Sequence, residues 1–229
     1  GVASTVLFAV VLCVCCASVS DASPKIIKMQ SIYALESKVP VGGESFVFFA
    51  KKVEEYTKGE VQIKLYAPNQ LIKSKEVFTA LQRGAIEAAG TNLLYYAGVV
   101  PEAFGSWLPY AWPDTREAMN LYLNHGYMDV LREATAKHGI HYVVPIACGS
   151  LGLITKFPVH KMEDLQGKKI RAAGSVGTFI QMLGGAPVSI SPSEQFMALQ
   201  RGTVDGMYYT LYALEAFSFH EVVDYIIYP

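Results

Sequence analysis

The residue whose chemistry points most directly to ligand recognition is Arg171, which follows Lys168 and Lys169 in a short segment. A guanidinium presents a planar fork of N–H donors to a carboxylate, and it keeps its charge at any working pH. Such a pair is much stronger in a closed crevice without water than on a surface. On an exposed strand the same arginine would simply be solvated beside the two lysines, so its role depends on its position in the fold.

Motifs of catalytic or phosphate-binding sites do not occur in the sequence. The glycines at residues 149–152 lack GxxxxGK[ST] spacing, and Ser150 is not in a GxSxG motif. The five histidines have no metal-ligand spacing. A net charge of −1 gives no electrostatic reason to bind nucleic acid. We therefore predict a protein without a metal, a cofactor or a nucleic-acid partner, and keep an enzyme as the alternative.

The beginning of the sequence has the composition of a targeting segment. Residues 5–19 are fifteen residues without a charge, fewer than the roughly 20 apolar residues of a bilayer-spanning helix. Ser20 and Ala22 then form a small-x-small pattern. We interpret residues 1–22 as a secretory signal with an incomplete start, cleaved after Ala22, and an uncleaved anchor is the alternative. Cleavage would leave only Cys148, so no disulfide within the chain is expected.

Apolar periodicity predicts alternating strands and helices in the first half of the chain. The expected strands are 26–32, 61–66 and 86–90, and the expected helices are 46–56 and 76–82. This order implies a mainly parallel sheet covered by helices. An aromatic loop over 101–113 should follow, with Trp107 and Tyr110 either in a pocket wall or in the core. Residues 115–137 read as one long helix capped by Asp114.

The second half repeats the alternation. The expected strands are 141–147, 151–155, 168–172, 188–190 and 204–207, and the expected helices are 176–183 and 192–200, with a short turn or helix at 161–165. An internal repeat links the halves, because seven of thirteen residues in 76–88 are identical to those in 194–206, 118 positions further on. A spacing of this size is too long for a solenoid and suggests one α/β unit used in each of two lobes. The acidic residues Glu87 and Asp205 occupy equivalent positions, which favours a shared structural role over a catalytic one.

Two α/β lobes leave a crevice between them, and small ligands bind outside the carboxyl ends of the strands. The polar residues at those ends are therefore the candidate site residues. They are Tyr33, Thr91, Asn92, Arg171, Tyr208, Tyr209 and Thr210. For Tyr209 and Tyr33 core packing is the alternative role, and Asn92 is equally suited to cap the segment that follows it.

Several segments resemble one known family. They are 81–84 (LQRG), 164–171 (DLQGKKIR), 183–188 (LGGAPV) and 196–206 (FMALQRGTVDG). In sequence and order they are similar to periplasmic solute receptors of tripartite ATP-independent periplasmic (TRAP) transporters, the DctP-like family. The resemblance runs from about Ile26 to the end and implies a two-lobe periplasmic-binding-protein-like fold, with 23–147 mainly lobe 1 and 148–229 mainly a truncated lobe 2.

The resemblance also implies a function. A DctP-like receptor would be exported, would work as a monomer in the periplasm, and would deliver a small carboxylate to the TRAP membrane permease subunits; a sensing partner is the alternative. In that family an arginine at the position of Arg171 pairs with the ligand carboxylate, and polar contacts fall near Asn92 and Tyr209. This chain lacks the second arginine that some members carry before Lys156. With Tyr208 and Tyr209 where acid-sugar receptors often have Glu-Asn, we expect a smaller or more apolar carboxylate.

Overall fold

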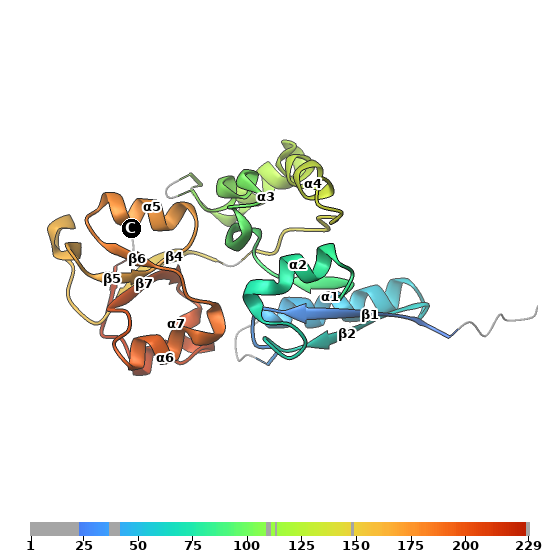
Figure 1. The fold of residues 1–229 in the computed structure, drawn as a ribbon, viewed down its shortest axis with the longest axis horizontal. Helices are drawn as coiled ribbons and strands as arrows, with labels where there is room; N and C mark the ends of the chain where they lie inside the picture. The colour runs from blue at the N-terminus through green and yellow to red at the C-terminus, as the bar shows by residue number, and fades with distance from the viewer. Residues whose placement is uncertain (1–22, 37–41, 109–110, 113, 148, 228–229) are drawn as a thin grey trace, which may run out of the picture.

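The strands of the protein form two separate sheets, each at the centre of its own lobe (Figure 1). A computed structural model describes residues 23–36, 42–108, 111–112, 114–147 and 149–227. The predicted two-lobe α/β architecture is confirmed. The expected signal segment 1–22 lies outside the described residues, as do Tyr110, Cys148 and the side chain of Trp107. The junction between the lobes, expected at residues 147–148, stays a prediction.

Lobe 1 is built on a three-stranded sheet whose strands are parallel, as the sequence predicts, and lie in the order β2-β1-β3. Its strands are β1 Lys25–Ser31, β2 Val61–Tyr66 and β3 Ala88–Gly90. Helix α1, Gly43–Tyr56, packs Phe46 against Met29 of β1. Helix α2, Val77–Gln82, follows a 3₁₀ turn over Ser74–Glu76 and buries its apolar residues in a second cluster.

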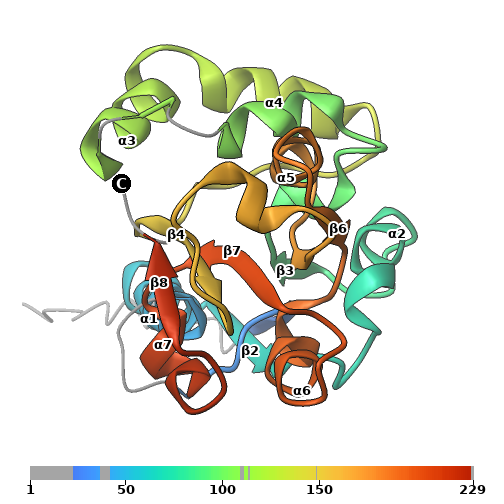
Figure 2. The same cartoon turned by 90° about the vertical axis from the view of Figure 1, so that its left-hand side faces the viewer.

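Lobe 2 contains a five-stranded mixed sheet in the order β6-β5-β7-β4-β8, in which β4 is antiparallel to both neighbours. The strands are β4 Leu151–Thr155, β5 Lys169–Arg171, β6 Ala186–Val188, β7 Gly206–Thr210 and β8 Tyr225–Ile227. Figure 2 shows the sheet between α5, Ser175–Met182, on one side and α6, Gln195–Gln200, with α7, Ala213–Ala216, on the other. Each face buries its own apolar cluster, one around Ile170 and one around Leu199.

The internal repeat is confirmed as a repeated structural unit. In lobe 2 the 3₁₀ turn Pro192–Glu194 and helix α6 occupy positions 118 residues beyond the turn and helix α2 of lobe 1. Each helix is followed, two residues after its end, by a glycine with positive φ, Gly84 at 66° and Gly202 at 70°. A left-handed conformation of this kind costs glycine little, which explains why both copies retain it.

The two acidic residues of the repeat also have one shared role. Oε2 of Glu87 accepts a hydrogen bond from the backbone N–H of Lys28 at 3.0 Å. Oδ2 of Asp205 accepts from the backbone N–H of Lys169 at 2.8 Å. Each carboxylate thus binds the neighbouring strand of its own sheet, and the expectation of a structural role is confirmed.

The expected long helix over 115–137 is wrong, because the segment forms two helices. Helix α3 spans Thr115–Asn124 and α4 spans Tyr127–Ala136. Gly126 between them has φ 79°, a left-handed conformation that interrupts a right-handed helix. The predicted cap of α3 is confirmed, since Asp114 accepts a hydrogen bond from the backbone N–H of Glu117 at 2.9 Å.

The expected strand over 141–147 is also wrong. A strand requires a neighbouring backbone ladder, and no described segment pairs with these residues. Arg132 of α4 instead donates to the carbonyl oxygens of Tyr142 and Val143, both at 3.2 Å. These apolar residues therefore line a cavity rather than extend a sheet.

Smaller differences concern element boundaries. The aromatic loop begins with 3₁₀ turns over Pro101–Trp107. The strand expected at 188–190 lies at Ala186–Val188, and the strand expected at 204–207 lies at Gly206–Thr210. For the first of these strands, the backbone N–H of Ala172 donates to the carbonyl oxygen of Val188, and this is the last hydrogen bond of the ladder. The strand therefore ends before residue 190.

Candidate functional site

Arg171 is the largest of the nearly inaccessible side chains, with 1% of its surface exposed. It is the last residue of β5, which lies between β6 and β7 and runs parallel to both. Its guanidinium therefore lies at the carboxyl edge of the lobe 2 sheet, where the parallel strands end. No acidic side chain pairs with it among the residues that the structure describes. A buried charge without a counter-ion is costly, which points to a missing anionic partner.

The hydrogen bonds of Arg171 fix one edge of its guanidinium. Nε donates to the carbonyl oxygen of Ile190 at 3.0 Å. In the amide orientation that satisfies both partners, Oε1 of Gln195 accepts from Nε and Nη2, each at 3.1 Å. Nη2 also donates to the hydroxyl of Tyr95 at 3.0 Å. Nη2 thus uses both of its N–H groups, whereas Nη1 donates to none of the described residues, so the two N–H groups of Nη1 are the part left for a ligand.

Aromatic rings surround this cation. Cζ of Arg171 lies 4.9 Å from the ring centroid of Tyr209 and 5.6 Å from that of Tyr95. Burial by itself lowers the pKa of Arg171, but the phenol groups of Tyr95, Tyr209 and Tyr33 outweigh it and raise the pKa above its ordinary value. The guanidinium thus keeps its positive charge although it is buried.

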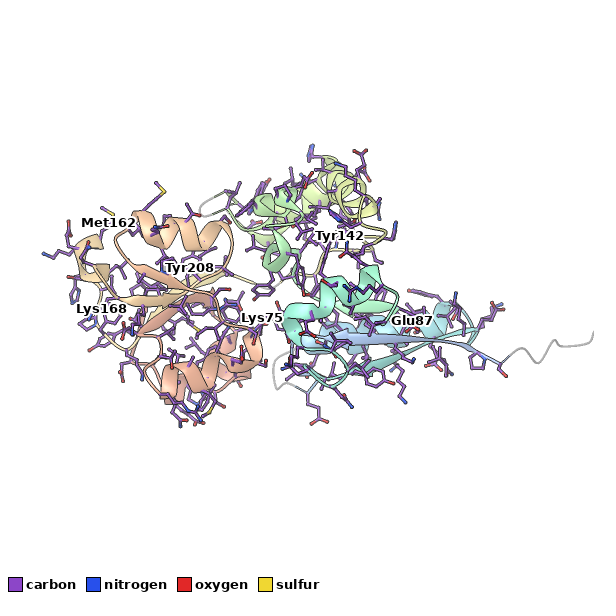
Figure 3. All side chains as sticks on the ribbon, in the orientation of Figure 1. Lys75, Glu87, Tyr142, Met162, Lys168 and Tyr208 are labelled. Atoms are coloured by element: carbon purple, nitrogen blue, oxygen red, sulfur yellow. The ribbon has the colours of Figure 1, made fainter. Side chains whose placement is uncertain are left out.

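A cavity of about 620 Å³ lies next to this cluster and draws its walls from both lobes. This volume is within the range of small-molecule sites. Five of the sequence-predicted residues contribute to its lining: Tyr33, Thr91, Asn92, Tyr208 and Thr210. Figure 3 shows Tyr208 in the lobe 2 sheet and Tyr142, another lining residue, below α3 and α4 of lobe 1.

Arg171 and Tyr209 are not among the lining residues of this cavity. Side chains alternate along a strand, and Tyr209 therefore points to the opposite face of β7 from Tyr208 and Thr210. Tyr33 connects the two groups, because it lines the cavity and also lies close enough to Arg171 to raise its pKa. The structure thus brings the predicted residues to one region, with the arginine on one side of it.

Two of the predicted polar residues have local structural partners. Oδ1 of Asn92 accepts from the backbone N–H of Leu94 at 2.9 Å and so caps the 3₁₀ turn Leu93–Tyr96. The hydroxyl of Thr91 lies 3.2 Å from that of Tyr96. The capping role that the sequence left open for Asn92 is therefore present, and a contact to ligand would have to come from its amide nitrogen.

Thr210 differs from these residues because its hydroxyl has no hydrogen-bond partner in the described part of the chain. The residue is 2% exposed, and Oγ1 makes no hydrogen bond to any described residue. Buried hydroxyl groups are normally satisfied, so this atom requires water or a ligand in the adjacent cavity. Thr210 is consequently a candidate for a second polar contact.

Sequence reasoning missed Tyr95 and Gln195. Both hydrogen-bond the guanidinium, but one lies in lobe 1 and the other begins a helix in lobe 2. The internal repeat could have pointed to Gln195, because the equivalent residue in the first copy is Val77. Both positions are fully buried, and an amide in place of valine breaks the local pattern of burial.

The lobes touch at several places besides the Tyr95–Arg171 bond. Nδ2 of Asn69 in lobe 1 donates to Oγ of Ser193 in lobe 2 at 3.2 Å. Phe217 of lobe 2 packs against the lobe 1 cluster that contains Tyr33. The structure therefore has its two lobes in contact around the candidate site.

The described residues contain neither a candidate metal cluster nor a candidate membrane-spanning helix. No cluster of three or more His, Cys, Asp or Glu side chains suited to a metal occurs in the described ranges, and the absence of a metal stays a prediction. Within those same ranges, none of the helices combines the length and apolar character needed to cross a bilayer.

The fold and the site define a two-lobed α/β protein with a cavity whose walls come from both lobes. The family model for bacterial extracellular solute-binding protein, family 7 (DctP) matches residues 33–229, and the chain belongs to that family. Solved structures similar to this chain include TRAP periplasmic solute-binding proteins with bound L-malate and with bound succinate. The resemblance found in the sequence is therefore confirmed.

Relatives and solved structures agree with this assignment. The C4-dicarboxylate-binding periplasmic protein DctP of Rhodobacter capsulatus is 29% identical over 81% of this chain and 55% of its own length. A TRAP periplasmic solute-binding protein of Sulfurospirillum deleyianum with bound succinate has a TM-score of 0.75 and 26% identity over 89% of this chain and 66% of that one.

A further structure shows the likeness of the fold alone. The TRAP protein of Pseudoalteromonas atlantica with bound sodium and pyruvate has a TM-score of 0.80 and 20% identity over 89% of this chain and 62% of that one. The chain spans between 43% and 60% of the length of three curated relatives that it matches.

Proposed function

We propose that this protein is an extracytoplasmic receptor that binds a small organic carboxylate between its lobes and delivers it to the membrane subunits of a TRAP transporter. The observation that carries the proposal is the guanidinium of Arg171, which is 1% exposed, charged and without an acidic partner among the described residues. A bound carboxylate would supply the missing counter-ion through charge-assisted hydrogen bonds.

The surroundings of Arg171 favour a small or partly apolar acid. Tyrosine rings rather than further charged groups face the guanidinium. The hydroxyl groups of tyrosines and of Thr210 offer neutral polar contacts beside it, which suits a ligand with one carboxylate and one further polar group. The similar protein of Sulfurospirillum deleyianum holds succinate, which is an acid of this size. Asn92, Thr91, Tyr33, Tyr208 and Tyr209 complete the proposed site.

A thermal-shift screen of the full-length protein against small carboxylates tests the proposal. At about 100 times its dissociation constant, a ligand stabilises the folded state by roughly 2.7 kcal/mol. For a protein of this size, the melting temperature should then rise by roughly 5–11 °C. Mass spectrometry of the released ligand should find it chemically unchanged. A screen in which no acid raises the melting temperature, or in which the bound acid is converted to a product, contradicts a receptor function.

Delivery to a transporter is the second part of the proposal, with a sensing receptor as its alternative. A permease encoded beside this gene favours transport, and uptake of the bound acid should then depend on both proteins. We expect the receptor to act as a monomer outside the cytoplasm.

A second test uses the contact between Gln195 and Arg171. Gln195→Glu places a carboxylate on the guanidinium without changing the size of the side chain, so that an internal counter-ion competes with the ligand. We expect ligand affinity to fall by about 10- to 100-fold in titration calorimetry. Gln200→Glu makes the same charge change at an exposed position of the same helix and should leave affinity unchanged. Equal affinities for the two variants would mean that the ligand does not use the charge of Arg171.

A further inference from the structure

The hydroxyl of Tyr95 is a hydrogen-bond donor left over beside Arg171. Nη2 of the guanidinium lies 3.0 Å from this oxygen. A guanidinium can only donate, so the phenol oxygen is the acceptor in this bond and its own hydrogen remains available. Within the described part of the chain that O–H donates to no residue. Tyr95 therefore adds a neutral donor beside the free end of the arginine fork.

We propose that Tyr95 is the lobe 1 half of the carboxylate clamp and contacts the ligand directly. One carboxylate oxygen accepts from Nη1 of Arg171, and the other accepts from the Tyr95 hydroxyl. This role rests on the proposed receptor function and adds to it a specificity-determining residue. The clamp then combines a charged donor from lobe 2 with a neutral donor from lobe 1.

The position of Tyr95 ties carboxylate binding to lobe closure. It belongs to the 3₁₀ turn Leu93–Tyr96, whose Leu94 packs so closely on Gly174 that a Cβ on this glycine would lie 2.5 Å from Cδ1 of Leu94. Separation of the lobes would withdraw Tyr95 from Arg171 and leave the carboxylate with half of its donors. The ligand thus has a higher affinity for the closed form, which is what a ligand needs to shift the population towards it.

The charge of the clamp also discriminates between ligands. Both oxygens of a carboxylate accept charge-assisted hydrogen bonds, whereas the corresponding primary amide has one acceptor oxygen and no negative charge to pair with Arg171. We therefore expect the acid to bind and its primary amide to bind far more weakly, because the buried guanidinium would keep no counter-ion.

Tyr95→Phe tests the proposal, because it removes the hydroxyl and retains the ring that packs beside the guanidinium. The probes are pyruvate, L-malate and succinate, titrated calorimetrically into the full-length protein. We expect affinity to fall by about tenfold or more, as for other hydrogen bonds to a charged group. Tyr127→Phe is the matched control, since its hydroxyl donates to the carbonyl of Glu102 within lobe 1, at 2.9 Å, and its removal should leave affinity unchanged.

Arg171→Lys tests whether Tyr95 contacts the ligand directly or acts only by positioning Arg171. If Tyr95 acts only by holding Arg171, adding Tyr95→Phe to Arg171→Lys will cause no further loss, and the proposal is overturned. A further severalfold loss in the double variant supports direct contact. Unchanged affinity in Tyr95→Phe overturns the proposal but leaves the receptor function standing. If none of the three acids binds the unmodified protein, the receptor for these acids and the clamp fail together.

Discussion

Alanine in place of Arg171 is expected to weaken carboxylate binding by about 30- to 5,000-fold, which corresponds to roughly 2–5 kcal/mol. The guanidinium is buried at the carboxyl edge of the lobe 2 sheet, and its Nη1 has two N–H groups that no described residue accepts. The variant leaves the ligand carboxylate in the same enclosed place without its opposite charge. Titration calorimetry with the acid found in the thermal-shift screen measures the loss.

The control for this variant is Arg201→Ala. Arg201 has the same side chain and lies in the same lobe, but it is exposed at the end of α6. Its removal should change affinity by less than about twofold, as expected for a solvated charge far from a ligand. Near-ultraviolet circular dichroism checks that both variants are folded. Undiminished binding by a folded Arg171→Ala protein would remove the arginine from the site and with it the central support for a carboxylate receptor.

The second large effect is on stability and concerns Gly43, the first residue of α1. A Cβ at this position would overlap the carbonyl oxygen of Ala34, in the segment that follows β1 and Tyr33. Neither backbone can move without displacing α1 or the strand, so Gly43→Ala should lower the free energy of unfolding by about 3 kcal/mol or more. The melting temperature should then fall by roughly 6–12 °C in calorimetry.

Gly98→Ala is the matched substitution for this experiment. Gly98 is exposed, its φ is not positive, and a Cβ there would meet no atom within 4 Å. Its melting temperature should stay close to that of the unmodified protein or rise slightly. If Gly43→Ala were as stable as Gly98→Ala, the close approach between α1 and the segment after β1 would be wrong.

The sequence was sufficient to predict elements whose pattern is local. Strand β2 was predicted with the bounds that it has, Val61–Tyr66, because apolar and polar residues alternate along it. The repeat predicted that the two lobes share a helix-glycine-strand corner, because seven identical residues out of thirteen favour the same local fold. The roles of Glu87 and Asp205 followed from that equivalence.

Elements that depend on distant partners were not predictable in this way. Residues 141–147 have the composition of a strand, yet no described segment pairs with them. Gly126 lies in a segment with a helical pattern, and its left-handed conformation rather than any change in that pattern divides the segment. The site shows the same limit, because Arg171 was predicted from its chemistry together with the family resemblance, whereas Tyr95 became its partner only through the contact between the lobes.

The duplicated corner has a consequence for how a guest molecule would be oriented. At equivalent positions lobe 2 has Gln195 and lobe 1 has Val77, and only the amide can hold a guanidinium in place. The anionic head of a guest would therefore always face the later half of the chain, and its tail would face the earlier half. Substitutions in the earlier half should then change which ligand tails are preferred, while binding of the anionic group by the later half stays the same.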